Sequence, residues 1–342
     1  MPSISPFRAL RYADTAGAIG DLVAPPYDVI DDDERRRYLA RSPYNVVHLT
    51  LPDSPEAAAA LLAHWKAGGV LREEEPSLWW LAQEFVGPDG VARTREGIAG
   101  SVEATPYAEG AVLPHELTHA GPKEGRLQVL RATRTQLEPI FLLYDAPPPC
   151  SRPAGEPDLE VDEGGVRTRL WRLGGDAIEL GVPLLIADGH HRYETAVAFR
   201  EEEPSATHTF AVLVSSQSPG VEIFPTHRMV QGVGVEPAAA PTAAWEHDAL
   251  AMYRAGSYFR VDAPDDLDAR QVQRYEPAGV AYTPYAERAV AVVDAGEAER
   301  AFLVRPPTIE QVYRIAPAGE TMPQKSTFFY PKLTSGLLFH PV

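Results

Sequence analysis

Two short stretches of the chain carry residues whose types and spacing could do chemistry, and the first is HELTH at His115–His119. It matches H-E-x-x-H, in which two histidines one helical turn apart bind zinc and the glutamate acts as a general base. That chemistry needs the motif inside a helix of about three turns. Pro114 precedes the stretch and Gly121-Pro122 follows it, so we expect helix to be blocked beyond about residue 120. A zinc metallopeptidase is therefore the disfavoured alternative, and His119 is expected to matter least.

The second stretch, DGHHR at Asp188–Arg192, directly follows the apolar run Leu184–Ala187. We expect a buried strand, a tight turn at Gly189 and then the start of a helix. Backbone N–H groups at a helix N-terminus and the helix dipole both favour an anion. Arginine adds a planar fork that suits phosphate oxygens. The sequence therefore predicts a phosphate- or nucleotide-binding turn made of Gly189, His190, His191 and Arg192.

Asp188 stands at the end of the predicted strand, where several roles are open to a carboxylate. It could hold a divalent cation, orient a histidine or cap the helix that follows. We predict a catalytic role for Asp188, with Mg²⁺ as the cation that it would hold. A metal site built from His190 and His191 is less favoured, because adjacent residues at a helix start rarely point the same way.

Basic and hydroxyl residues gather at three further places: Lys123 with Arg126 and Arg131, His227-Arg228, and the two C-terminal runs Lys325-Ser326-Thr327 and Tyr330-Pro331-Lys332. Each set taken alone is an ordinary solvated surface. From these sets we expect Lys123, Arg126 and Lys325 to clamp anionic groups of a substrate or nucleotide.

Composition narrows the class of partner. The chain has 342 residues and a formal charge of −17, and such an acidic surface disfavours nucleic acid and anionic membranes as partners. A basic helix-turn-helix is also missing from the sequence. The chain has one cysteine, Cys150, no apolar run that approaches 18 residues and no signal-like N-terminal segment. We therefore expect a cytoplasmic protein that binds a small phosphoester or nucleotide, with homo-oligomer formation left open.

Periodicity predicts the elements that must position these residues. Helices are expected over 33–41, 55–66, 123–137, 174–181 and from Tyr193 through Phe199, and strands over 45–51, 77–86, 91–103, 139–144, 159–163, 166–173, 183–187 and 207–215. Residues 237–244 (PAAAPTAA) are expected to be a loop or a lobe boundary. The alternation of helices, strands and hairpins predicts an α+β, mixed α/β fold. Three parts are expected: an N-terminal α+β lobe over 1–105, a core over 106–236 and a C-terminal α+β segment over 237–342 that packs back on the core.

Several motifs occur together and in order along nearly the whole chain. They are PFRALRY and APPYDVI near the start, HExT, GPK, LLRAT-like and PIF segments in the middle, then ADGHHRYETA, PTHR and MPxKSTxFxPKLxxGL. In this combination the sequence resembles the bacterial and archaeal domain-of-unknown-function-1015 family.

The core also has a more distant resemblance, to the ParB/sulfiredoxin superfamily and in particular to its free-serine kinases. The shared order is His-Glu, a helix, Pro-Ile and a strand, then strand, DGHHR and helix. The resemblance implies a ParB/sulfiredoxin-like core in which Gly189–Arg192 cradles nucleotide phosphates.

The same resemblance implies a chemistry. Glu116, with His115 beside it, would act as the base toward a substrate hydroxyl, and ATP or ADP would be the co-substrate. We therefore expect a phosphotransferase or phosphohydrolase that acts on a small hydroxylated metabolite, with serine or phosphoserine as the most specific candidate. A nucleotide-binding regulatory protein without turnover is the main alternative.

Overall fold

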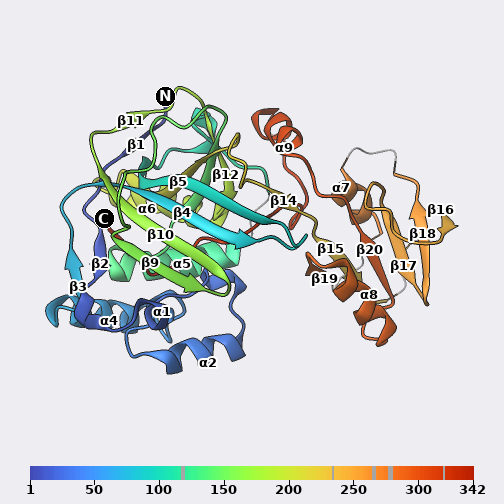
Figure 1. Cartoon of the computed structure of the whole chain (residues 1–342), viewed down its shortest axis with the longest axis horizontal. Coiled ribbons are helices and arrows are strands. Elements are labelled where there is room, and N and C mark those ends of the chain that lie inside the picture. Colours follow the sequence, from blue (N-terminus) through green and yellow to red (C-terminus); the bar gives the residue numbers. More distant parts are fainter. Residues whose placement is uncertain (117–119, 233–234, 264–266, 276–279, 319) are drawn as a thin grey trace. The chain divides into compact units, whose positions relative to one another are not determined.

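The chain forms two compact units in its structure, a computed structural model that describes residues 1–116, 120–232, 235–263, 267–275, 280–318 and 320–342 (Figure 1). The first unit comprises Met1–Pro114, Thr118–Val221 and Pro331–Val342, and the second comprises His115–Leu117 and Glu222–Tyr330. The chain therefore leaves the first unit after Val221 and returns to it at Pro331.

A mixed sheet forms the centre of the first unit. Its described strands follow the order β6-β12-β8-β13-β5-β4-β10-β9, with β1 beside β5 and β11 beside β1. Most neighbours are antiparallel, but β13 is parallel to β8 and β12 is parallel to β6. This arrangement confirms the predicted mixed α/β fold class. The strands are β1 (Ser3–Ser5), β4 (Leu78–Val86), β5 (Ala92–Glu103), β6 (Val112–Leu113), β8 (Ile140–Tyr144), β9 (Leu159–Glu163), β10 (Val166–Gly174), β11 (Ile178–Glu179), β12 (Leu184–Asp188) and β13 (His208–Ser215).

Helices and two short strand pairs complete the first unit. The helices α5 and α6 pack against each other, and α6 also contacts β8 and β13. An apolar cluster that includes Leu62, Trp65 and Phe339 is formed partly by residues of the N-terminal helices. These helices gather on one side of this unit (Figure 1). The helices are α1 (Ile19–Leu22), α2 (Asp32–Arg41), α3 (Val47–Thr50), α4 (Pro55–Ala67), α5 (Ala120–Thr133) and α6 (His190–Glu202), with 3-10 turns at Asp14–Ala16, Tyr27–Val29 and Tyr107–Glu109, and the paired strands are β2 (Leu10–Tyr12) with β3 (Leu71–Glu73) and β7 (Thr135–Gln136) with β22 (His340–Pro341).

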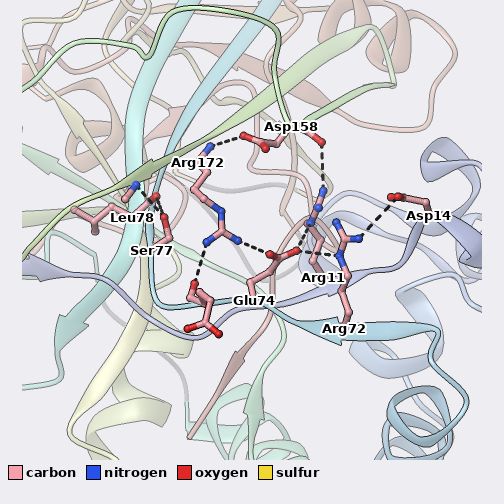
Figure 2. Close-up of polar contacts among 10 residues, drawn as sticks. Arg11, Asp14, Arg72, Glu74, Ser77, Leu78, Asp158 and Arg172 are labelled. Carbon is pink, nitrogen blue, oxygen red and sulfur yellow. Dashed lines mark hydrogen bonds and ion pairs between the residues drawn. The ribbon is translucent and has the colours of Figure 1, made fainter.

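An ion cluster around Glu74 ties the β2–β3 pair to the large sheet (Figure 2). Arg11 and Arg72 are cross-strand partners on β2 and β3, and the Nε of each donates to Glu74 Oε1 at 3.0 Å. Arg172 of β10 bonds to the other carboxylate oxygen, and its backbone N–H donates to Asp158 at 2.6 Å. We call this set the Glu74 cluster.

The second unit is built around an antiparallel sheet. Its described strands follow the order β16-β18-β17-β20-β15-β19, and α8 packs on β15 and β20. The elements are β14 (Ile223–Phe224), β15 (His227–Val230), β16 (Ala239–Thr242), β17 (Ala251–Arg254), β18 (Ser257–Val261), α7 (Asp268–Gln273), β19 (Val280–Thr283), α8 (Ala286–Asp294), β20 (Arg300–Leu303), α9 (Ile309–Ile315), a 3-10 turn at Ala316–Ala318 and β21 (Phe328–Phe329), which pairs with β14.

Three predicted elements are wrong, and non-local contacts explain two of them. Residues 45–51, predicted as a strand, contain the helix α3, because Asn45 accepts from the N–H of Val47 and donates to two carbonyls near α1. The region 237–244, predicted as a loop, contains β16, which pairs with β18. The region 174–181, predicted as a helix, contains β11 instead, and it begins with two glycines at positive φ.

The predicted three-part division of the chain stays a prediction. In the structure, β4 and β5 from the predicted N-terminal lobe share a sheet with β8, β12 and β13 from the predicted core. Within the described ranges, no helix has the length and the apolar character that crossing a lipid bilayer requires.

Candidate functional site

The DGHHR turn lies in the first unit, between a buried strand and a helix as predicted. The strand β12 ends at Asp188, Gly189 adopts φ +97° and α6 begins at His190. The register with β8 shifts between Ile186 and Asp188, and such a bulge changes the direction of the side chain that follows it. A Cβ on residue 189 would lie 3.0 Å from Nε and 3.1 Å from Cζ of Arg192. Glycine is therefore needed here both for its φ and for the space that Arg192 occupies.

Two cationic side chains meet the carboxylate of Asp188. Arg192, four residues along the chain, bonds to Oδ2, and Lys332, 144 residues away, bonds to Oδ1. Arg192 also donates to the carbonyl of Pro139, just before β8. Less than a fifth of each of the three charged side chains is exposed, so all three are largely removed from water. We call Asp188, Arg192 and Lys332 the Asp188 cluster.

The charges of this cluster determine its protonation. Burial alone would raise the pKa of Asp188, but Lys332 and then Arg192 outweigh it, and the pKa lies well below its usual value. His190 acts in the same direction to a smaller extent. Burial alone would lower the pKa of Arg192, and Asp188 reverses this effect. Asp188 and Arg192 are therefore charged at neutral pH, and the cluster joins two basic side chains to one carboxylate.

A second buried carboxylate, Glu138, lies near the Asp188 cluster. Its Oε1 accepts from the backbone N–H of Tyr27 and from the hydroxyl of Ser335, both at 2.9 Å. Burial raises the pKa of Glu138, and the nearby Arg192 and Arg126 offset this only in part. The segments around residues 27, 138, 188 and 335 are thus joined by polar contacts inside one unit.

The cavity beside Arg192 is too small for a nucleotide. It has a volume of about 60 Å³ and lies among α5, α6 and β8, with Arg126, Glu138 and Arg192 as its charged lining. This volume has room for a few water molecules, whereas ligand pockets have volumes of roughly 300–1,000 Å³. This cavity is therefore not a nucleotide pocket.

The two predicted clamps on α5 have separate partners. Arg126 donates to the carbonyl of Thr50 at 2.6 Å, and its guanidinium carbon lies 4.1 Å from the ring centre of Tyr27. Lys123 Nζ lies 3.9 Å from a carboxylate oxygen of Glu194. Lys123 and Glu194 also line a larger pocket of about 310 Å³ on the flank of α6.

The predicted Mg²⁺ at Asp188 does not fit the contacts of that residue. Mg²⁺ requires a near-octahedral set of oxygen ligands. Both oxygens of Asp188 are already held by Arg192 and Lys332. In the part of the chain that the structure describes, no three His, Cys, Asp or Glu side chains come together as a metal-binding group. The geometry supports an ion pair at Asp188.

His115 and Glu116 belong to the second unit, where they contact the segment that follows Met322. Glu116 forms a β-bridge with Met322, whose N–H donates to the carbonyl of His115 at 2.8 Å. The Oε1 of Glu116 accepts from the backbone N–H of Thr327 at 3.1 Å and from its hydroxyl at 2.9 Å. The fully buried ring of His115 contacts the same hydroxyl through Nε2 at 2.8 Å. Since the hydroxyl donates to Glu116, Nε2 of His115 must be the donor to Thr327.

The zinc alternative fails on the backbone of this stretch. A zinc protease would need His115 and Glu116 inside a helix, but both precede α5, and Glu116 is in a β-bridge. The predicted helix end near residue 120 is wrong, because Ala120 begins α5 and Pro122 falls within its first turn, where proline is tolerated. His119, which completes the motif, lies outside the described residues.

The remaining predicted residues are placed as follows. Lys325 is exposed in a turn of the second unit with φ +57°, a rare conformation for a residue with a side chain. His190 and His191 are half-buried in the first turn of α6. Glu116 belongs to the second unit and the DGHHR turn to the first, so their predicted convergence stays a prediction.

Sequence reasoning missed the residue that completes the Asp188 cluster. The sequence places Lys332 in a basic set that is typical of an ordinary surface, and it gives no indication of a role for Glu138 or Ser335. The available signal was the position of Lys332 inside MPxKSTxFxPKLxxGL, one of the motifs that carry the family resemblance. Spacing alone could not have paired residues 144 positions apart.

Comparison with solved structures found distant likenesses. A free serine kinase in complex with AMP is 17% identical, with 68% of this chain and 86% of that chain covered and a TM-score of 0.43. SbnI with C-terminal truncation from Staphylococcus aureus is 11% identical, with 71% and 81% covered and a TM-score of 0.43. A conserved hypothetical protein from Pyrococcus furiosus is 17% identical, with 68% and 90% covered and a TM-score of 0.39. Likenesses at these TM-scores carry no argument about function.

Sequence comparison gives the family. No curated protein matches the chain. A family pattern does match, over residues 4–274, which is more than half of the chain and includes the DGHHR turn. The chain therefore belongs to the family described as Protein of unknown function (DUF1015).

Proposed function

We propose that the chain binds the phosphate groups of a nucleotide or phosphoester at the Asp188 cluster. The observation that carries the proposal is the convergence of Arg192 and Lys332 on the N-terminal end of α6, a helix of 13 residues. This end of a helix attracts anions, and Gly189 gives it no side-chain cap. The cluster brings two basic side chains to one carboxylate in a chain with a formal charge of −17. Both cations are held in place by Asp188, so their side chains lose little freedom when a phosphate binds.

We further propose that the chain is a phosphotransferase or phosphohydrolase for a small hydroxylated metabolite. Phosphoryl transfer depends mainly on positioning and on neutralising charge, which Arg192 and Lys332 would supply. The pocket of about 310 Å³ beside Lys123 and Glu194 has the size and the mixed charge for a small metabolite such as serine or phosphoserine. Glu116 would be the base, oriented by Thr327. Because the order of motifs in the sequence resembles that of free-serine kinases, ATP and ADP are the first co-substrates to test.

Binding of ADP and of inorganic pyrophosphate by titration calorimetry tests the first proposal. Lys332→Ala should weaken both at least about tenfold, since a charged hydrogen bond contributes about 1.5–3 kcal/mol. Lys66→Ala is the matched control, because Lys66 is an exposed lysine on α4. Dissociation constants that are the same for Lys332→Ala and wild type would overturn the phosphate site.

A nucleotide-binding regulatory protein without turnover is the second candidate. The observation that favours it is the double hydrogen bond from Thr327 to Oε1 of Glu116, which is also what a structural carboxylate would accept. Glu116→Gln separates the two candidates. An enzyme should lose turnover of ATP with serine while it still binds ADP, whereas a regulator shows ADP binding and no turnover in either form.

A further inference from the structure

The main chain next to Lys332 is held by a row of buried polar side chains. Arg95 on β5, Gln83 on β4 and Thr168 on β10 are direct cross-strand partners. All three are nearly or fully buried. They form a continuous polar row across three neighbouring strands of a sheet whose other buried residues are mostly apolar.

The row bonds to the segment that re-enters the first unit. Arg95 Nη2 donates to the carbonyl of Pro331 at 2.6 Å and also to Oε1 of Gln83. Gln83 Nε2 donates to the carbonyl of Lys332 at 3.3 Å. Thr168 lies 3.4 Å from the hydroxyl of Thr334. Pro331 is the residue at which the chain returns to the first unit, so the row fixes the very start of that segment.

The polar row costs desolvation free energy that an apolar core at the same place would not. A fully buried arginine must be desolvated, and Nε of Arg95 has no hydrogen-bond partner among the described residues. Apolar side chains of similar volume often stabilise a core as well as buried charges do. The guanidinium carbon lies 4.4 Å from the ring centre of Phe141 on β8, the strand that pairs with β12. The row therefore joins the Lys332 segment to the sheet beside the strand that ends in Asp188.

We propose that Gln83 and Arg95 are positioning residues that hold Lys332 at the Asp188 cluster, an inference that rests on the phosphate site proposed above. Their hydrogen bonds fix two successive carbonyls, those of Pro331 and Lys332. Because both carbonyls are fixed, the backbone of Lys332 is held in one position, from which its side chain reaches Asp188 Oδ1. Loss of the row would leave the lysine present but badly placed, so phosphate binding would suffer more than the fold.

The test measures pyrophosphate binding and unfolding midpoints in parallel. Gln83→Met keeps the length of the side chain but removes both its donor and its acceptor. It should weaken pyrophosphate binding about as much as Lys332→Ala does, roughly tenfold, and it should add less than about twofold in the Lys332→Ala background. Ser101→Ala is the control, since Ser101 is a buried hydroxyl on β5 that bonds to Ser5. That variant should lower the unfolding midpoint and leave the dissociation constant unchanged.

The outcomes separate this inference from the function on which it rests. If Lys332→Ala weakens binding and Gln83→Met does not, the positioning role is overturned and the phosphate site stands. The positioning role is also overturned if Gln83→Met and Ser101→Ala weaken pyrophosphate binding equally. The same holds if the effects of Gln83→Met and Lys332→Ala on binding add up when the two substitutions are combined. If Lys332→Ala itself leaves binding unchanged, the phosphate site fails and this inference fails with it. Gln83→Glu replaces Gln83→Met if the latter does not fold, because it keeps the acceptor for Arg95 and lacks the donor for Lys332.

Discussion

The Glu74 cluster and the Asp188 cluster are both carboxylates surrounded by cations, yet they differ in what lies around them. Three arginines, from β2, β3 and β10, meet Glu74, and the acidic Asp14 and Asp158 lie close to the same arginines (Figure 2). Three positive charges thus face three negative ones. Two cations meet Asp188 at a helix N-terminus, and Glu138 and Asp28 also act on Arg192.

The comparison shows that charge density alone does not identify a binding site. Arg11 and Arg172 also lie over the ring of Trp79, and such packing suits a permanent tie between two parts of a fold. The Asp188 cluster adds a glycine at positive φ and a cation from a distant segment. The helix end and the cation from a distant segment, rather than the number of ion pairs, favour the Asp188 cluster as the functional one.

The largest effect is expected from removing the central carboxylate of each cluster. Asp188→Asn leaves two largely buried cations without their partner and should lower the free energy of unfolding by about 3 kcal/mol. Pyrophosphate at millimolar concentration should restore much of the loss, since it replaces the missing charge. Glu74→Gln should also destabilise, but without this rescue. Thermal unfolding with and without pyrophosphate is the measurement, and equal rescue of both variants would erase the distinction.

Gly189→Ala should break the Asp188 cluster while every charge is kept. The added Cβ would push Arg192 from its place, so we expect pyrophosphate binding to weaken about 100-fold, near the upper value for a charged hydrogen bond. Gly110→Ala is the matched control, because Gly110 has φ +71° and open space around its Cβ position. Both variants should lose about 1–2 kcal/mol of stability from backbone strain. Binding that is equally unaffected in both would contradict the assigned role of Gly189.

The contribution of Asp188 to the free energy of unfolding should decrease at low pH, which distinguishes it from Glu138. Because its pKa is depressed in the folded state, its stabilising effect is complete above the usual aspartate pKa of about 4 and is lost as the pH falls toward the folded value. The stability gap between wild type and Asp188→Asn should therefore narrow below about pH 4. Glu138, whose pKa is raised, should behave in the opposite way, with wild type gaining relative to Glu138→Gln as the pH falls from 7. Urea unfolding at several pH values measures both gaps.

The smallest effect is expected at the rim of the Glu74 cluster. Arg72 is almost half exposed, and an ion pair at such a position contributes about 0–1 kcal/mol. Arg72→Ala should therefore cost less than about 1 kcal/mol in low salt and less again in 1 M NaCl, where screening is strong. Pyrophosphate binding should stay at the wild-type value. A clear loss of binding would make the Glu74 cluster a second anion site.

Several elements were predictable because their causes are local. The β4–β5 hairpin follows from two alternating runs around Gly87-Pro88-Asp89-Gly90, and α2 follows from the capping box of Asp31 and Glu34. The DGHHR turn belongs to the same class, since an apolar strand, a glycine and a helical pattern are neighbours in sequence. The short helix α3 was missed because contacts of Asn45 with residues more than 20 positions away decide its conformation.

The sequence by itself therefore determined the strand, turn and helix that present Gly189 and Arg192, because φ preferences and hydrophobic periods are properties of adjacent residues. Only the tertiary structure decided which charges meet there. In the structure, both oxygens of Asp188 bond to Arg192 and Lys332, where the sequence suggested a metal. Glu138 and Ser335 lie close to this cluster. Contacts across 144 residues depend on how the whole sheet closes around its core, and no local pattern encodes that closure.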